Sequence, residues 1–468
     1  MTEESALQEE SKAAVETEAP EDSKPAVLLE PDLDFVRELK GAGGDTLKKC
    51  FQCATCSVVC ALSPDKKPYP RKEMIYCQWG LKDRLLNSVD VWLCHYCNDC
   101  STYCPRGARP GDVLRAVRAL SFRHFAFPSF MGKVVGQARY WPIMLAIPVL
   151  VLLLGLAGTG HLHIPEGPVE LREFFPLYLV DSIFITFTSL AVISFAFGLW
   201  NFLQGIHGNA ISEGYAEDKP LVPADYVKSL ISVIPTILLH RKFKLCTTNR
   251  DRYLAHILLL FGFVGLFVVT SIGATALYPL HWLGIKADFL APPYTFINPV
   301  KWLALVSGLS VLIGIILVIT NRYKTKVAES TTTYLDWALI LAILCIVITG
   351  FLTWISRVAN AGSFAYIIYF LHLVCVFYII AYLPYSKLAH LVYRTVAMGY
   401  AAYIDRPFGV EVAVVVPPAA APAPGRAPVE KQPAVEKAAA EAGPEPEEKV
   451  EAPAEAEAPV ETAEEKKE

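Results

Sequence analysis

CFQCATCSVVC at residues 50–60 and CHYCNDCSTYC at residues 94–104 are the two most distinctive stretches of this chain. Each run has the spacing C-x2-C-x2-C-x3-C, and together they hold eight of the twelve cysteines among the 468 residues. This spacing is typical of proteins with two [4Fe–4S] clusters, in which three neighbouring thiolates bind one cluster and the fourth cysteine binds the other. The runs therefore predict a domain that carries two iron–sulfur clusters.

The crossed pattern divides the eight cysteines into two ligand sets. These are Cys50, Cys53, Cys56 and Cys104 for cluster 1, and Cys94, Cys97, Cys100 and Cys60 for cluster 2. Soft thiolates suit iron–sulfur centres, and Pro105 follows the second run as a proline does in bacterial ferredoxins. A pair of zinc ribbons is the alternative, because C-x2-C pairs also bind zinc, but a single zinc site would leave half of these thiols unused.

The composition changes sharply along the chain, from polar ends to an apolar middle. Hydrophobic residues make up 53% of the chain, and its formal net charge of −4 gives no support to nucleic-acid binding. No positively charged segment followed by an apolar stretch opens the chain, so we expect no secretory signal and a cytoplasmic cluster domain, where thiolates persist. The predicted parts are a disordered acidic tail at 1–27, a ferredoxin-like domain at 28–127, a membrane domain at 128–406 and a disordered Ala/Pro/Glu-rich tail at 407–468.

Helical patterns surround the cysteine runs. Helices are expected at 31–40, at 71–86 as one or two amphipathic segments, and at 112–125. The last of these carries Arg115, Arg118 and Arg123, whose charges we expect to face a partner or the membrane surface. Cys77 lies outside both runs and is interpreted as a buried small hydrophobic residue rather than a ligand.

Six apolar segments follow, each close to the roughly 20 residues that cross the hydrocarbon core of a membrane. They lie at about 141–158, 178–203, 254–279, 300–321, 335–355 and 364–384. If the cluster domain is cytoplasmic, the loops at 204–253 and 322–334 lie on the same side, and these loops are rich in Lys and Arg, whereas the opposite loops hold few. This agrees with the positive-inside rule and predicts a multi-pass protein of the cytoplasmic membrane with both termini in the cytoplasm.

Histidines within or beside these segments are candidate functional residues, because an ionisable group in a membrane is costly. His256 lies near the inner end of the third segment, and His390 lies just beyond the inner end of the sixth. We expect the two to share a depth and to bind one low-spin b-type haem between two helices. The alternative is a pair of interfacial histidines whose side chains merely reach water.

A second haem is predicted with fewer constraints. His372 lies within the sixth segment toward the outer leaflet, eighteen residues before His390, so that a continuous helix would present both on one face. Pro384 should kink such a helix. No other histidine falls inside a segment at that depth, and His281, just outside the third segment, is the nearest candidate partner.

Two stretches of the chain resemble known families. Residues 32–120 resemble the small iron–sulfur subunit of heterodisulfide reductases, and the matching residues are both cysteine runs, Pro70-Arg71-Lys72, Trp79-Gly80-Leu81-Lys82, Trp92-Leu93-Cys94 and Cys104-Pro105-Arg106-Gly107. Residues 250–394 resemble the cytochrome b gamma subunit of respiratory nitrate reductase, and the matching residues are Ala255-His256-Ile257, Pro279-Leu280-His281-Trp282, Thr331-Thr332-Thr333, Leu371-His372-Leu373 and the stretch from Leu383 to His390. The fused order is similar to that of the QmoC family, from the quinone-interacting membrane-bound oxidoreductase complexes of sulfate reducers.

The nitrate reductase resemblance implies roles for individual histidines. It implies that His256 and His390 bind the haem nearer the cytoplasm and that His372 binds an outer haem. The second ligand of the outer haem in that family matches Leu266 here. An outer haem in this chain would therefore need His281 or another ligand.

The same resemblance matches Lys301, in Pro299-Val300-Lys301, to a lysine implicated in quinol binding. The alternative is a lysine that anchors the start of the fourth segment at the membrane interface. The chain has no doubled Cys-Cys motif of heterodisulfide-cleaving subunits and no flavin or P-loop signature, so chemistry on a soluble substrate is expected on another subunit.

These resemblances imply a mainly α protein: a small all-α di-cluster ferredoxin-type cytoplasmic domain, then a six-helix transmembrane cytochrome b domain, with disordered termini. They imply electron transfer between menaquinol and soluble flavin and iron–sulfur subunits (QmoA- and QmoB-like) by haem b and two [4Fe–4S] clusters, toward adenylylsulfate reductase in sulfate respiration. The alternatives are a heterodisulfide-reductase-like or sulfite-pathway membrane redox subunit and, in another class, a membrane anchor with structural clusters.

Overall fold

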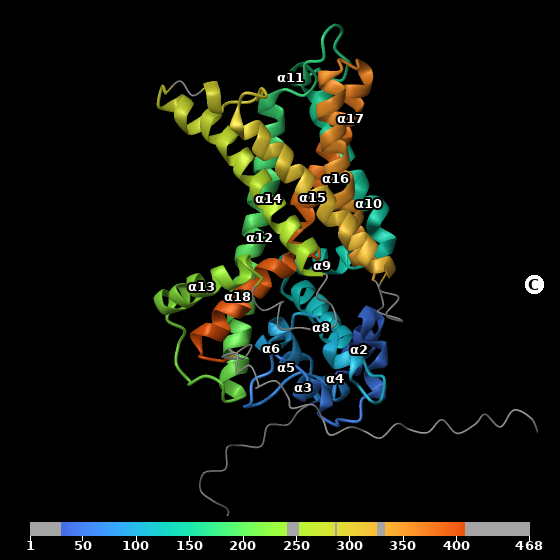
Figure 1. Cartoon of the computed structure of the whole chain (residues 1–468), viewed down its shortest axis with the longest axis vertical. Coiled ribbons are helices and arrows are strands. Elements are labelled where there is room, and N and C mark those ends of the chain that lie inside the picture. Colours follow the sequence, from blue (N-terminus) through green and yellow to red (C-terminus); the bar gives the residue numbers. More distant parts are fainter. Residues whose placement is uncertain (1–29, 241–251, 286–287, 325–332, 408–468) are drawn as a thin grey trace, which may run out of the picture. The chain divides into compact units, whose positions relative to one another are not determined.

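The computed structural model describes residues 30–240, 252–285, 288–324 and 333–407 (Figure 1). Contacts divide the chain into two units, Met1–Glu411 and Val412–Glu468, and every described residue belongs to the first. The described residues form helices, turns and loops without a strand, which confirms the prediction of a mainly α fold. The predicted tails lie outside the described residues, apart from Pro407.

The cluster domain is built from short helices. They are α2 (Leu33–Leu39), α3 (Thr55–Val58), α4 (Arg71–Gln78), α5 (Lys82–Leu86), α6 (Val89–Leu93), α7 (Asp99–Thr102), α8 (Pro110–Phe125) and α9 (Ser129–Val135). Asp32 caps α2 by accepting a hydrogen bond of 2.7 Å from the amide of Phe35. Gly80 separates α4 from α5 because its φ is +67° and because a Cβ there would lie 2.8 Å from the carbonyl oxygen of Asp32.

The hydrophobic core of the cluster domain continues into the membrane helices. Its fully buried side chains include Leu39, Met74, Cys77, Leu85, Val91, Trp92, Val113 and Val117. The Trp92 ring stacks on Tyr393 at a centroid distance of 5.7 Å and meets the edge of Phe202 at 5.5 Å. Such aromatic pairs contribute about 0.5–1.5 kcal/mol each beyond their buried area, so they help to hold the cluster domain on these helices.

The apolar segments form long helices. They are α10 (Trp141–Gly158), α12 (Leu177–Ser212), α14 (Arg252–Thr275), α15 (Pro299–Lys324), α16 (Tyr334–Val358) and α17 (Ser363–Tyr382). By length and composition the described residues contain six candidate membrane spans, as the sequence predicts. Shorter helices join them, namely α11 (Leu171–Phe174), α13 (Pro223–Leu238) and α18 (Ala389–Tyr403).

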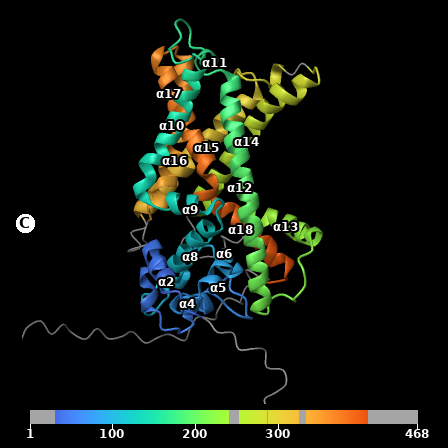
Figure 2. The ribbon, with the colours of Figure 1, turned by 180° about the vertical axis from the view of Figure 1, so that it is seen from behind.

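The long helices pack along the chain order. Helix α14 packs on α15, α15 on α16 and α16 on α17, while α17 also contacts α10 and α12 (Figure 2). The α14–α15 pair is close because α14 presents glycines to it: a Cβ on Gly262 would lie 2.6 Å from the side chain of Val311. Small residues at such contacts are typical of helices that associate in membranes.

The structure corrects one expectation about the membrane helices and refines another. Helix α12 runs on to Ser212, and the predicted inner loop at 204–253 contains helix α13. His372 and His390 lie on separate helices rather than on a kinked one, because α17 ends at Tyr382 and α18 begins at Ala389. Pro384 lies in the turn between them, where its missing N–H and fixed φ end the helix.

Arg115 and Arg118 of α8, which were expected to face a partner or the membrane surface, instead bond to other parts of this chain. Arg115 donates to the buried carboxylate of Asp336 at the start of α16, at 2.7 Å. Asp336 also contacts Lys387, and with Thr333 it forms the capping box that begins α16. One buried carboxylate therefore joins the cluster domain to two segments of the membrane domain.

A second buried ionic network joins the same parts. Lys72 of α4 contacts three carboxylates, Glu73 at 3.3 Å, Asp90 at 3.0 Å and Glu213 at 2.7 Å. Arg406, after α18, binds both carboxylate oxygens of Asp90. Burial raises the pKa of the Glu73 carboxyl to about 7, and the neighbouring Lys72 opposes this shift.

We predict that Glu73→Gln changes how stability depends on pH. A carboxyl whose folded pKa is raised stabilises the fold below its unfolded pKa of about 4.5, and this contribution is lost as pH rises through about 7. Between pH 5 and pH 8 the free energy of unfolding of the wild type should fall, relative to that of the variant, by up to about 3 kcal/mol. Thermal unfolding at both pH values measures this, with the exposed Glu217→Gln as control, and equal pH dependence in wild type and Glu73→Gln would contradict it.

Candidate redox site

The two cysteine runs share one backbone conformation. The residues on either side of Cys53 have φ values of 60° and 68°, and those on either side of Cys97 have φ values of 56° and 70°. Non-glycine residues rarely adopt positive φ, and those that do are concentrated at binding sites. Each bend is followed by a one-turn helix, α3 or α7. The bends fold each run back on itself and gather its cysteines.

The structure brings the eight thiols together in two groups of four. Electrostatic interactions join Cys50, Cys53, Cys56 and Cys104 in one group and Cys60, Cys94, Cys97 and Cys100 in the other, and Cys100 also interacts with Cys56 of the first group. The fourth cysteine of each run thus lies with the other run, as in the two sets expected from the sequence. Within the described residues, no group of three or more His, Cys, Asp or Glu side chains is placed to hold a metal ion.

The surroundings of the thiols affect how they bind metal. Burial raises the pKa of the Cys56 thiol to about 11 and that of Cys60 to about 12. The Thr55 hydroxyl, 3.4 Å from the sulfur of Cys53, lowers the pKa of that exposed thiol. Because iron binds thiolates, assembly of a cluster on these residues releases protons. Cys77 is buried in the core, as expected for a small hydrophobic residue.

Three histidines lie close together where α13, α14 and α18 meet the cluster domain. His256 of α14 interacts electrostatically with His390 of α18 and with His240, which follows α13. The rings of His240 and His256 have centroids 6.1 Å apart. The Nδ1 of His390 hydrogen-bonds the carbonyl oxygen of Lys387, so its Nε2 is left to bind a metal. His240 was not expected at this site, because its position depends on helix α13, which was not predicted.

His372 lies in α17 beside α16. Its Nδ1 is 3.1 Å from the hydroxyl oxygen of Thr349, whose own proton goes to the carbonyl of Cys345 at 2.7 Å. Nδ1 of His372 therefore donates to Thr349, and Nε2 is left as an acceptor or ligand. His281 is exposed after the π-helical segment Ala276–Leu280, and no hydrogen bond or ring contact within the described residues joins it to His372. A second haem stays a prediction.

Lys301 lies near the start of α15, among aromatic side chains. Its ammonium is 4.4 Å from the centroid of Trp354 and 6.0 Å from that of Phe296. This cation–π contact holds the lysine in place and leaves its N–H groups able to donate hydrogen bonds. The geometry is compatible with both interpretations of Lys301, the quinol ligand and the interfacial anchor.

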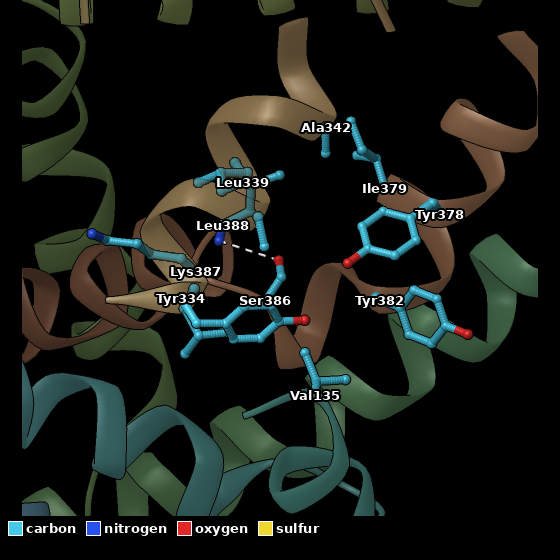
Figure 3. A pocket seen from close by; sticks show the side chains of 12 residues that line it. Val135, Tyr334, Leu339, Ala342, Tyr378, Ile379, Tyr382, Ser386, Lys387 and Leu388 are labelled. Carbon is cyan, nitrogen blue, oxygen red and sulfur yellow. Dashed lines mark hydrogen bonds between the residues drawn. The ribbon is translucent and has the colours of Figure 1, made fainter. Parts of the chain in front are cut away.

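A small cavity of about 30 Å³ lies between α16 and α17 (Figure 3). Tyr334, Tyr378 and Tyr382 contribute to its lining, and the hydroxyl of Tyr334 is buried without a hydrogen-bond partner among the described residues. The amide of Leu388 donates to the hydroxyl of Ser386 at its edge, at 3.2 Å. The cavity has room for about one water molecule, which could satisfy Tyr334.

Comparison with known families agrees with this division of the chain. Residues 46–108 match the family described as 4Fe-4S dicluster domain, and residues 186–407 match the family described as Citrate utilization protein B. The first match covers both cysteine runs and confirms the prediction of iron–sulfur clusters. No solved structure matches the chain.

Several curated relatives are components of redox complexes. The C subunit of the H(2):CoB-CoM heterodisulfide,ferredoxin reductase from Methanothermobacter marburgensis is 38% identical over 150 residues, which are 30% of this chain and 80% of the relative. The corresponding protein of Methanothermobacter thermautotrophicus has the same identity and coverage. The E subunit of the dihydromethanophenazine:CoB--CoM heterodisulfide reductase from Methanosarcina thermophila is 24% identical over 249 residues, which are 46% of this chain and 91% of the relative.

A domain with two four-cysteine groups, followed by helices that can span a membrane, defines a membrane-bound iron–sulfur electron-transfer subunit. The chain belongs to the family of the heterodisulfide reductase C subunits, and it carries in addition a membrane region similar to the E subunit. The fusion of these two parts agrees with the order expected from the sequence.

Proposed function

We propose that this protein transfers electrons between menaquinol in the membrane and soluble flavin and iron–sulfur subunits of the same complex. Electrons pass through haem b and the two [4Fe–4S] clusters. Their final acceptor is adenylylsulfate reductase in sulfate respiration. The protein crosses the cytoplasmic membrane several times, with the cluster domain and both termini in the cytoplasm, and its domain limits are those predicted from the sequence.

The main support for this proposal is that both kinds of candidate site lie in one packed unit. Helix α18, which begins beside His390, packs on helix α6, which leads into Cys94. His256 interacts with His390 from the neighbouring α14. Electron carriers at these sites would lie in sequence through the protein, and an anchor with structural clusters would not need the histidines.

The residues present fit a haem at the inner site. Two imidazoles come from different helices, and His390 has one ring nitrogen held by a backbone carbonyl, the arrangement typical of metal-binding histidines. A haem held there supplies reversible one-electron storage between a two-electron quinol and one-electron clusters. His256 and His390 would hold the iron, while His240 lies beside the pair.

Redox titration of the purified complex tests the function. Optical spectra should show a b-type haem, and paramagnetic resonance should show clusters that become reduced when a menaquinol analogue is added. Clusters that never change oxidation state under these conditions would support the membrane-anchor alternative and contradict the proposal.

Substitution of the two inner histidines tests the haem ligands. We predict that His256→Ala and His390→Ala each remove the same haem absorption band, because either change leaves the iron with one ligand. His161→Ala, in the loop after α10, is the control and should keep the full haem content. Loss of different haem bands in the two variants would show that these histidines do not form a pair.

Lys301→Ala tests the proposed quinol site. The variant should oxidise a menaquinol analogue about tenfold more slowly with unchanged haem content, because a charged hydrogen-bond donor to the quinol is lost. Lys301→Arg should keep part of the activity. Unchanged kinetics in Lys301→Ala would leave the interfacial-anchor interpretation.

A second candidate function replaces the quinone with a phenazine. It is supported by the similarity of the membrane region to a relative whose name includes dihydromethanophenazine. The same reduction experiment with a phenazine electron donor distinguishes the two, since the preferred donor reduces the haem faster.

A further inference from the structure

The loop from Cys94 to Cys97, which belongs to cluster 2, is held by arginines from three helices. Arg118 of α8 donates to the carbonyl oxygen of Cys94 at 2.7 Å, and Arg394 of α18 donates to the same oxygen at 3.2 Å. Arg252 of α14 donates to the carbonyl oxygen of Tyr96 at 2.9 Å. Two of these arginines come from the helices that carry the candidate haem ligands.

Each of these two helices has its arginine one turn from its histidine. Arg252 precedes His256 by four residues in α14, and Arg394 follows His390 by four residues in α18. Residues four apart lie on the same face of a helix, about 6 Å apart along its axis. Both helices therefore present a histidine to the inner site and an arginine to the cluster 2 loop.

The corresponding loop of cluster 1 has different neighbours. Its carbonyls at Gln52 and Cys50 accept from Arg71 and Gln78, at 3.1 and 2.8 Å, and both donors belong to α4 of the cluster domain. Phe51 is 65% exposed, and Cys53 is exposed as well. Cluster 1 thus faces outward, and these contacts of its loop stay within the cluster domain.

We propose that cluster 2 is the centre that exchanges electrons with the inner haem, and that Arg252 and Arg394 are the positioning residues that hold it there. This inference rests on the proposed function. A haem held by His256 and His390 would supply one electron at a time, and cluster 2 would accept it. Each menaquinol oxidised to menaquinone would supply two such electrons and release two protons, and cluster 1 would pass the electrons to the soluble flavin subunit.

The arginines also set the electrostatics of this step. Reduction adds a negative charge to a cluster, and nearby cations stabilise that charge, which raises the reduction potential. Arg252, Arg394 and Arg118 all place a guanidinium on the cluster 2 loop, whereas Arg71 does so on the cluster 1 loop. Loss of one arginine should therefore affect the potential of one cluster.

The first test uses the wild-type complex. Cys53→Ser and Cys97→Ser variants assign the two paramagnetic cluster signals, and the complex is then mixed with a menaquinol analogue and frozen at increasing times. The cluster 2 signal should rise before the cluster 1 signal. The inference would be overturned if cluster 1 were reduced first, or if the haem became reduced and neither cluster followed.

The second test compares matched arginine variants of the complex. In Arg394→Leu and Arg252→Leu the haem should be reduced at the wild-type rate, while the cluster 2 signal should appear about tenfold more slowly and titrate at a more negative potential. Arg394→Lys should recover much of the potential, because it keeps the charge. Arg71→Leu is the control: it should shift cluster 1 alone and leave the reduction of cluster 2 unchanged.

The outcomes separate this inference from the proposed function. A wild-type complex without haem absorption would overturn both. Two results together would overturn this inference alone. The haem would be reduced by menaquinol, and the reduction of cluster 2 would be delayed in Arg71→Leu but not in the Arg252 and Arg394 variants. Haem and iron contents are measured for every variant. If the leucine variants lose haem or iron, the order in which the two clusters are reduced in the wild type decides whether the inference stands.

Discussion

The ion pair between Arg115 and the buried carboxylate of Asp336 is the interaction on which the arrangement of this protein depends. A charge removed from water needs a partner, and breaking such a pair by removing one side typically costs about 3–5 kcal/mol. Asp336 begins α16, and it binds Arg115 of the cluster domain together with Lys387 beside α18. The cluster domain is therefore joined to the membrane helices by directional bonds as well as by the apolar packing of Trp92.

The attachment of the cluster domain to the membrane helices determines which side chains surround each cysteine loop. With α8 fixed against α16 and α18, the loop of cluster 2 meets the first turn of α14 and the body of α18. The inner histidines lie one helical turn from those contacts. The other face of the cluster domain, around Cys53 and Phe51, stays open to solvent. The two cysteine loops therefore have different surroundings, helices α14 and α18 for one and solvent for the other, and this difference supports the proposed relay.

Local patterns predicted much of this structure. The helices near 31–40, 71–86 and 112–125 and the six long apolar helices follow from hydrophobic periodicity and length, which depend on neighbouring residues alone. The grouping of thiols was predicted from spacing, because the cluster chemistry constrains it. The interruption between His372 and His390 was expected at Pro384, whose ring cannot continue a helix. His240 was missed, because its place beside His256 depends on how α13 packs against α18.

The amino-acid sequence by itself determined the iron–sulfur domain, through eight cysteines in two runs, and predicted a site at the histidines near the ends of apolar segments, because ligand type and spacing are local properties. Only the tertiary structure showed which charged side chains face the interior of the protein. Arg118, Arg252 and Arg394 read as ordinary basic residues near a membrane surface, yet they converge on one cysteine loop. More than a hundred residues separate each of these arginines from the next, and only the packing of three helices can bring them to the carbonyl groups of one loop.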